Sequence, residues 1–70
     1  MPNVVAHITG TVFRVEKAAG DSVSPGETVV ILESMKMEMP VEATVGGRVR
    51  EVRCKPGQSV NEGDVLVVLE

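Results

Sequence analysis

Apolar residues along this chain gather in short blocks rich in valine, separated by turns of glycine, proline and polar residues. The blocks lie at residues 4–8, 11–15, 28–32, 37–45, 48–52 and 65–69. Their length and β-branched composition are typical of strands, and no stretch combines helical period with helical length. Glycine in the turns permits positive φ, and proline presets φ for tight turns. The pattern predicts an all-β protein.

The two halves of the chain repeat each other at an offset of 37 residues. When residues 1–33 are aligned with 38–70, twelve of the 33 pairs are identical, whereas about three would match by chance in a chain this rich in valine and glycine. We interpret the match as an internal duplication within one domain, residues 1–70. Seventy residues are enough for one small core and no more.

Duplicated halves built of short strands predict two small antiparallel sheets, related by a quasi-two-fold axis and packed face to face as a flattened barrel. This fold is a barrel-sandwich hybrid. Period-two alternation in the last block of each half places four residues in a symmetric core, namely Val30, Leu32, Val67 and Leu69.

The valines of one block in each half are spaced by three positions. Val12 and Val15 form one such pair, and Val49 and Val52 form its repeat mate. Residues three apart cannot both face one side of a regular pleat. We therefore predict a β-bulge or strong bend in each of these strands, with all four valines buried.

Four residues fall between the repeats: Ser34, Met35, Lys36 and Met37. They join the last strand of the first half to the first strand of the second, so Lys36 is predicted at a hairpin tip. Two-residue hairpin loops favour Asn-Gly or another glycine-containing pair. Because Met35-Lys36 is poor turn chemistry, these residues are expected to serve another purpose.

The segment Ser34-Met35-Lys36-Met37, followed by Pro40-Val41 and a Gly46-Gly47 turn, resembles the biotinyl/lipoyl attachment domain. In that family the modified lysine lies in a Met-Lys-Met hairpin. The resemblance covers the whole chain and is strongest to the free-standing members of the family, the biotin/lipoyl attachment proteins.

The resemblance implies that a biotin protein ligase attaches biotin to Lys36. The loaded domain would then act as a swinging-arm carrier of activated carboxyl between the sites of a biotin-dependent carboxylase and its carboxyltransferase component. Met35 and Met37 match the flanking residues that the ligase recognises, and the neighbouring Glu33, Ser34 and Glu38 complete the expected recognition set.

Two alternatives stay open at this point. Lipoyl domains carry an acidic residue three positions before the lysine, where this chain has Glu33, and the biotin pattern usually has alanine where this chain has Ser34. A lipoyl group attached to Lys36 by a lipoate ligase, alone or in addition to biotin, is therefore the second hypothesis. The third is an unmodified interaction module that binds a partner through its apolar tip.

Charge and composition exclude several other classes of function. The net charge is −3 and the seven Lys and Arg residues are scattered, which argues against nucleic acid and against an anionic membrane surface. No apolar run is long enough to span a bilayer. Cys54 is the only cysteine, so no internal disulfide can form and a cytoplasmic location is expected. The domain is also expected to be a monomer.

Candidate catalytic chemistry is sparse. There is no Cys/His cluster for zinc or another metal, no phosphate loop and no evident triad around the single histidine. His7 is expected to be a strand residue, Met39 a core residue, and Cys54 an unreactive thiol. Because a lysine amine is protonated at neutral pH, Lys36 must receive its acyl group from an external enzyme. The chain is predicted to be a carrier and not an enzyme.

Overall fold

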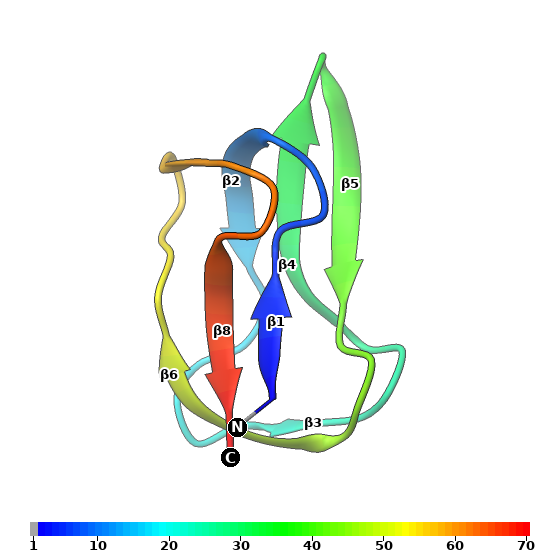
Figure 1. Ribbon diagram of the computed structural model, residues 1–70, viewed down its shortest axis with the longest axis vertical. Coiled ribbons are helices and arrows are strands. Elements are labelled where there is room, and N and C mark those ends of the chain that lie inside the picture. The colour runs from blue at the N-terminus through cyan, green and yellow to red at the C-terminus, as the bar shows by residue number, and fades with distance from the viewer. Residues whose placement is uncertain (1) are drawn as a thin grey trace.

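The computed structural model describes residues 2–70, which form eight strands and no helix. The strands are β1 (Asn3–Val5), β2 (Gly10–Val15), β3 (Ser22–Val23), β4 (Thr28–Ser34), β5 (Met37–Glu42), β6 (Gly47–Val52), β7 (Ser59–Val60) and β8 (Val65–Leu69). Two four-stranded antiparallel sheets result, with strand orders β1-β8-β6-β3 and β5-β4-β2-β7 (Figure 1). The predicted all-β fold of two packed sheets is confirmed. Met1, the first residue of the predicted repeat, lies outside the described residues.

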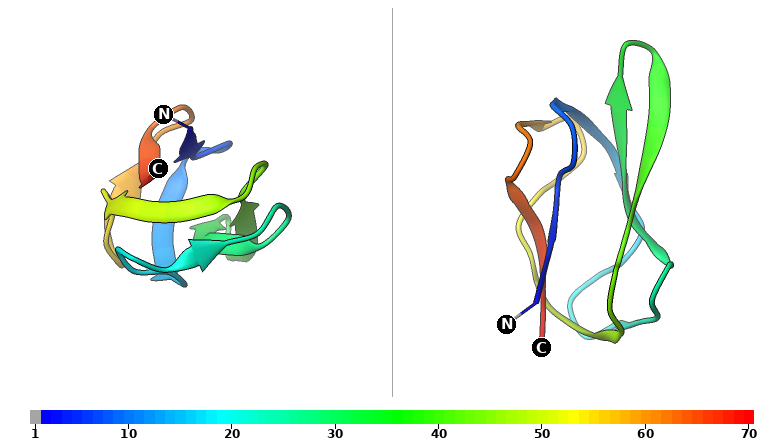
Figure 2. Two further views of the ribbon diagram at one scale, coloured as in Figure 1. Left: turned by 90° about the horizontal axis from the view of Figure 1, so that it is seen from below. Right: turned by 45° about the vertical axis from the view of Figure 1, so that its right-hand side comes forward.

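The strands of the two halves correspond at the offset of 37 residues. β2, β3 and β4 have β6, β7 and β8 as their mates, and β1 corresponds to the end of β5. Each half supplies the two central strands of one sheet and the two edge strands of the other. Neither half can complete a sheet alone, so the halves interlock. Viewed from below, the strands wrap into a flattened barrel (Figure 2).

Backbone hydrogen bonds outside the strands obey the same symmetry. The Ala6 amide donates to the carbonyl of Asp64 over 2.9 Å, and its mate Ala43 donates to Glu27 over 3.0 Å. Equivalent loops are therefore held in equivalent ways. Each position can therefore be compared with its repeat mate in an equivalent structural environment.

The core lies between the sheets and is almost entirely aliphatic. Val30, Leu32, Val67 and Leu69 are buried as predicted. The remaining buried residues are Val4, Ala6, Val12, Val23, Val29, Val41, Ala43, Val49, Cys54, Val60 and Leu66. Met39 was expected in the core, but it is only half-buried because β5 extends past the opposite sheet toward its free end.

Both predicted bulges are present. The register of β2 against β4 shifts between Val12 and Arg14, and that of β6 against β8 shifts between Val49 and Glu51. Val12 and Val49 are buried. The prediction that their partners are equally buried is wrong, because Val15 and Val52 end their strands and only lean against the core.

Two further details differ from the sequence prediction. His7 is an exposed residue of a bend, not of a strand, because β1 ends at Val5 and the chain turns there to reach the other sheet. The two-residue strands β3 and β7 were not foreseen. Each contains a single buried valine, Val23 or Val60. Two residues are too few to show the alternation of buried and exposed positions that distinguishes a strand from a turn.

One surface ion pair distinguishes the halves. In the first half, Lys17 Nζ lies 2.6 Å from a carboxylate oxygen of Glu27, and the Ser24 amide donates to the same carboxylate over 2.9 Å. The ion-paired hydrogen bond from Lys17 and the bond from Ser24 together hold the pKa of Glu27 below its usual range. The second half has Cys54 in place of Lys17.

Candidate attachment site at the β4–β5 hairpin tip

The hairpin between β4 and β5 has a two-residue loop. Glu33 pairs with Glu38 and Ser34 pairs with Met37, which leaves only Met35 and Lys36 between the strands. Their φ angles are 54° and 65°. Positive φ at both central residues defines a type I′ turn, the loop that best matches the twist of paired strands. The prediction of Lys36 at a hairpin tip is confirmed.

The tip adopts this turn without the residues that favour it. Left-handed conformations cost a non-glycine residue roughly 1–2 kcal/mol, and neither Met35 nor Lys36 is glycine, asparagine or aspartate. The long β4–β5 ladder imposes the turn on them, because β4 is a central strand also paired with β2. Backbone strain of this kind concentrates at functional sites.

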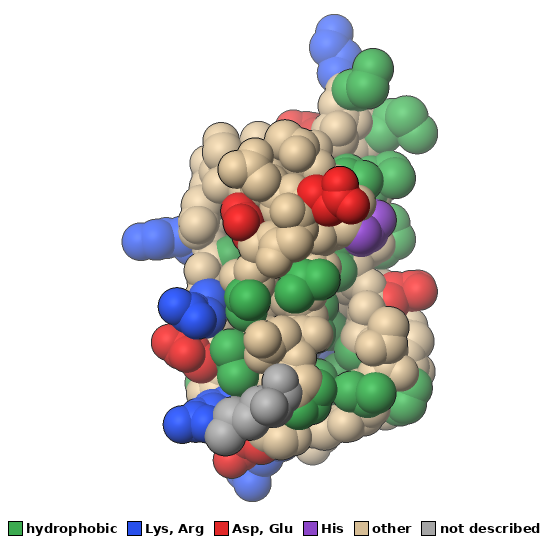
Figure 3. All heavy atoms as spheres, viewed as in Figure 1, with side chains coloured by type: hydrophobic (Ala, Val, Ile, Leu, Met, Phe, Trp, Pro, Cys, Tyr) green, Lys and Arg blue, Asp and Glu red, His purple; other side chains and the backbone are tan. Residues whose placement is uncertain are grey.

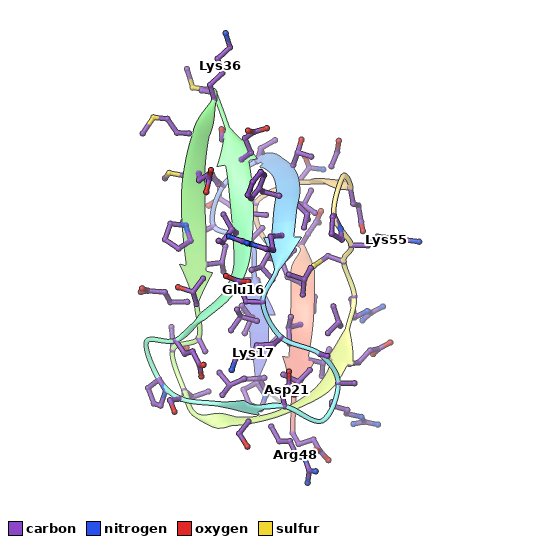
Figure 4. All side chains as sticks on the ribbon, turned by 180° about the vertical axis from the view of Figure 1, so that it is seen from behind. Glu16, Lys17, Asp21, Lys36, Arg48 and Lys55 are labelled. Carbon is purple, nitrogen blue, oxygen red and sulfur yellow. The ribbon has the colours of Figure 1, made fainter. Side chains whose placement is uncertain are left out.

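Lys36 stands clear of the rest of the molecule. Its side chain is exposed and extends from the far end of the hairpin, beyond the loops that close the barrel (Figure 4). The chain ends lie at the opposite pole (Figure 1). Within residues 2–70 its ammonium group has neither a hydrogen bond nor an ion pair. The amine is therefore accessible to another macromolecule from several sides.

The side chains next to Lys36 divide into an apolar and an acidic group. Met35 is 92% exposed and Met37 is 61% exposed, and hydrophobic side chains gather at the protruding end of the molecule (Figure 3). Strand alternation places Ser34 and Met37 on the face that continues the core side of the sheet. Glu33 and Glu38 lie on the other face.

Glu33 and Glu38 are both exposed and face each other directly across the ladder. Like charges in this position destabilise a hairpin by a few tenths of a kcal/mol up to about 1 kcal/mol. Packing does not require this arrangement, since neither carboxylate is buried. It places two negative charges on one face of the hairpin near the tip, and neither carboxylate forms an ion pair with Lys36.

All five predicted recognition residues lie in this one segment around Lys36. Four of them are exposed, and Ser34 is half-buried. The arrangement lacks the features that activate a lysine, because the amine is neither desolvated nor next to another cation. The hairpin is suited to presenting the Lys36 amine, and acylation of that amine requires an external group that activates the acyl donor.

The hollow that the described chain contains lies away from the hairpin. A shallow hollow of about 330 Å³ is lined by Arg53, Gln58, Val60, Asp64 and Val65. None of these residues belongs to the hairpin. Among residues 2–70 there is no group of three or more His, Cys, Asp or Glu side chains placed to hold a metal ion, and no helix is long and apolar enough to cross a bilayer.

Comparison with known proteins agrees with this geometry. The biotin/lipoyl family profile, described as "Biotin-requiring enzyme", matches residues 1–69. The biotin/lipoyl attachment protein of Bacillus subtilis is 48% identical over 66 residues, which are 94% of this chain and 90% of that protein. The mitochondrial propionyl-CoA carboxylase alpha chain of Sus scrofa is 43% identical over 61 residues, or 87% of this chain, but the match spans only 8% of its length.

Solved structures of similar fold include a carboxylase and a lipoyl domain. The urea carboxylase of Kluyveromyces lactis superposes with a TM-score of 0.92 at 36% identity, over 99% of this chain and 6% of that one. The lipoyl domain of the 2-oxoglutarate dehydrogenase complex of Azotobacter vinelandii superposes with a TM-score of 0.73 at 32% identity, over 89% of this chain and 78% of that one. With the fold, the hairpin and the sequence in agreement, the chain belongs to the biotin/lipoyl attachment domain family.

Proposed function

We propose that this protein is a biotin carrier in which an amide joins the carboxyl group of biotin to Nζ of Lys36. The observation that carries the proposal is the position of Lys36. It is an exposed, unpaired lysine held by a two-residue turn of positive φ at the far end of the β4–β5 hairpin. The family described as requiring biotin, and the likeness to carboxylase domains, support biotin as the group.

The protein contributes position and reach to this function. The flexible four-carbon stem of lysine lets an attached group move, while the β4–β5 ladder fixes the point from which it swings. When bound, biotin supplies the chemistry of carboxyl transfer. Amide formation removes the positive charge of Lys36, so the loaded tip retains only the charges of Glu33 and Glu38.

Loading requires a partner that activates the acyl group, and we assign this role to a biotin protein ligase. Acylation of a lysine amine releases a proton, and within residues 2–70 no side chain is hydrogen-bonded or ion-paired to Nζ of Lys36 to accept it. The ligase must therefore supply an activated biotinyl donor and accept the proton. Met35 and Met37 offer it apolar contacts, and Glu33, Ser34 and Glu38 offer polar contacts beside them.

The carrier role also implies a carboxylase and a carboxyltransferase site between which the arm moves. Support comes from relatives in which a similar domain is one part of a much longer carboxylase chain. We propose that this chain serves such sites.

A lipoyl group on the same nitrogen is the second candidate. One observation favours it, the acidic Glu33 three residues before Lys36. Against it stand the two methionines beside the lysine and the better superposition on the urea carboxylase than on the lipoyl domain. The mass of the protein purified from its native host distinguishes biotin, lipoate and a bare lysine.

The proposal predicts that labelling depends on Lys36 alone. Purified protein is incubated with a biotin protein ligase, biotin and ATP, and capture on streptavidin is measured. Lys36→Arg should abolish capture, because arginine keeps the charge but offers no amine that can be acylated. The matched control is Lys55→Arg, which removes another exposed lysine and should be captured like the wild type. Capture of the Lys36→Arg variant would refute the assignment.

A further inference from the structure

The methionine and cysteine residues of the described chain differ sharply in their exposure to solvent. Met35 and Met37 are 92% and 61% exposed, Met39 is half-buried and Cys54 is 8% exposed. The two accessible sulfurs flank Lys36 on either side. Such exposure is unusual for methionine, which ordinarily packs in cores.

Cysteine is usually the sulfur that oxidants reach first, because a thiolate is far more nucleophilic than a thioether. Here Cys54 is poorly placed to protect the tip. It lies in the core cluster, and burial raises the pKa of its thiol, so the group stays protonated and shielded. The thioethers of Met35 and Met37 are then the most accessible oxidisable groups in residues 2–70.

We propose that Met35 and Met37 are sites of reversible oxidation, and that their oxidation prevents the loading of Lys36. The second part rests on the proposed function, because it concerns the ligase that modifies the same tip. The oxidant class is a peroxide, with hydrogen peroxide as the simplest example.

The reaction is a two-electron oxygen transfer at each sulfur. The thioether sulfur attacks one peroxide oxygen, a sulfur–oxygen bond forms as the oxygen–oxygen bond breaks, and the other oxygen leaves as water after proton transfer. The sulfur is oxidised to the sulfoxide and the peroxide is reduced. A thiol-dependent methionine sulfoxide reductase reverses the change, giving thioether, water and a disulfide in the reductase.

Oxidation should alter recognition without unfolding the domain. Neither sulfur lies in the core cluster, and the backbone ladder of β4 and β5 makes no use of either side chain. A sulfoxide is strongly polar, so it would replace the apolar surface on both sides of Lys36 with a dipole. A ligase surface that receives two thioethers would lose those contacts.

The test measures where oxidation occurs and what it does to loading. Wild-type protein is treated with limiting hydrogen peroxide, its oxidised residues are mapped by peptide mass spectrometry, and the rate of ligase labelling is compared before and after treatment. Met35 and Met37 should oxidise before Met39 and Cys54. The labelling rate should fall at least about fivefold, as expected for the loss of a favourable apolar contact, and a methionine sulfoxide reductase should restore it.

The matched variant is Met35→Leu with Met37→Leu, which keeps apolar side chains of similar size but cannot form sulfoxides. Each protein is compared with its own untreated rate, so a changed starting rate does not affect the result. Peroxide should leave the double variant's rate unchanged, whereas a Met39→Leu variant should stay as sensitive as the wild type.

Each outcome has a distinct meaning. Earlier oxidation of Met39 or Cys54 would overturn the assignment of the sites, and an unchanged labelling rate in protein with oxidised Met35 and Met37 would overturn the effect on loading. A large drop in thermal stability on oxidation would also overturn it, since the loss would then be structural. If the untreated wild type is not labelled at all, the proposed function fails, while the peptide map still decides whether the two tip methionines are the oxidation sites.

Discussion

Lys36 differs from the other lysines of the chain in its backbone and its neighbours. Lys17 is engaged with Glu27 and with the carbonyl of Ser22, and Lys55 follows β6 in an ordinary exposed loop. Only Lys36 combines exposure, positive φ and flanking methionines. The internal repeat and the Met-Lys-Met motif were enough to predict from the sequence that Lys36 is the modified lysine at a hairpin tip. The size of the backbone penalty became clear only from the φ angles.

At the residue scale, we predict that Met35→Asn stabilises the fold. Asparagine is the preferred residue at the first position of a type I′ turn and tolerates positive φ, so the change should recover about 1 kcal/mol of the strain at φ 54°. For a domain of this size that corresponds to a rise of roughly 4–8 °C in melting temperature.

Calorimetry of the unmodified protein measures this effect, with Met37→Asn as the control. Met37 lies in β5 and lacks the positive φ, so asparagine there should give no gain. A melting temperature lowered by Met35→Asn would mean that the turn is not strained at this position. The stabilised variant should also be labelled more slowly, because it lacks one of the two exposed thioethers.

At the element scale, the hairpin depends on a close approach between β2 and β4. A β-carbon at Gly10 would lie 2.6 Å from the carbonyl oxygen of Glu33, whereas one at its repeat mate Gly47 would lie 3.2 Å from that of Glu70. Glu33 is inside β4, so its carbonyl cannot move without disturbing the ladder. Glu70 lies beyond the end of β8 and can shift more easily.

We therefore predict that Gly10→Ala destabilises the domain by about 1–3 kcal/mol, a typical cost of overpacking. Gly47→Ala should cost clearly less. Urea unfolding of the two variants measures the difference, and the symmetry of the fold makes each the control for the other. Equal losses, or a larger loss for Gly47→Ala, would contradict the account of the hairpin base.

The elements also show which sequence signals predict structure well. A spacing of three between Val12 and Val15, duplicated in the second half, predicted both bulges, because strand geometry admits few other solutions. The burial of Val15 was overestimated, since spacing does not reveal where a strand ends. Strands β3 and β7 could not be predicted from the sequence, because two residues are too few to show periodicity. They are defined by pairing with a strand of the other half.

At the scale of the whole molecule, the duplication explains why the proposed attachment site is at one pole. The β4–β5 hairpin is the symmetry mate of the point where β8 pairs with β1. One pole therefore carries a connected, protruding tip, and the opposite pole carries residues 2 and 70 (Figure 1). The repeat predicted the hairpin tip, because the four residues that fall between its two copies had to join the last strand of one half to the first strand of the other. The scaffold alone does not identify the group that the tip would carry, because a urea carboxylase and a lipoyl domain both contain this fold.

The most direct test of the central claim is fragmentation mass spectrometry of the protein purified from its native host. We expect a biotinyl amide on Nζ of Lys36 within the peptide that contains Met35 and Met37, and unmodified side chains at Lys17 and Lys55. Biotin found on either of those lysines, or Lys36 found bare in protein from cells that hold active biotin protein ligase, would contradict it.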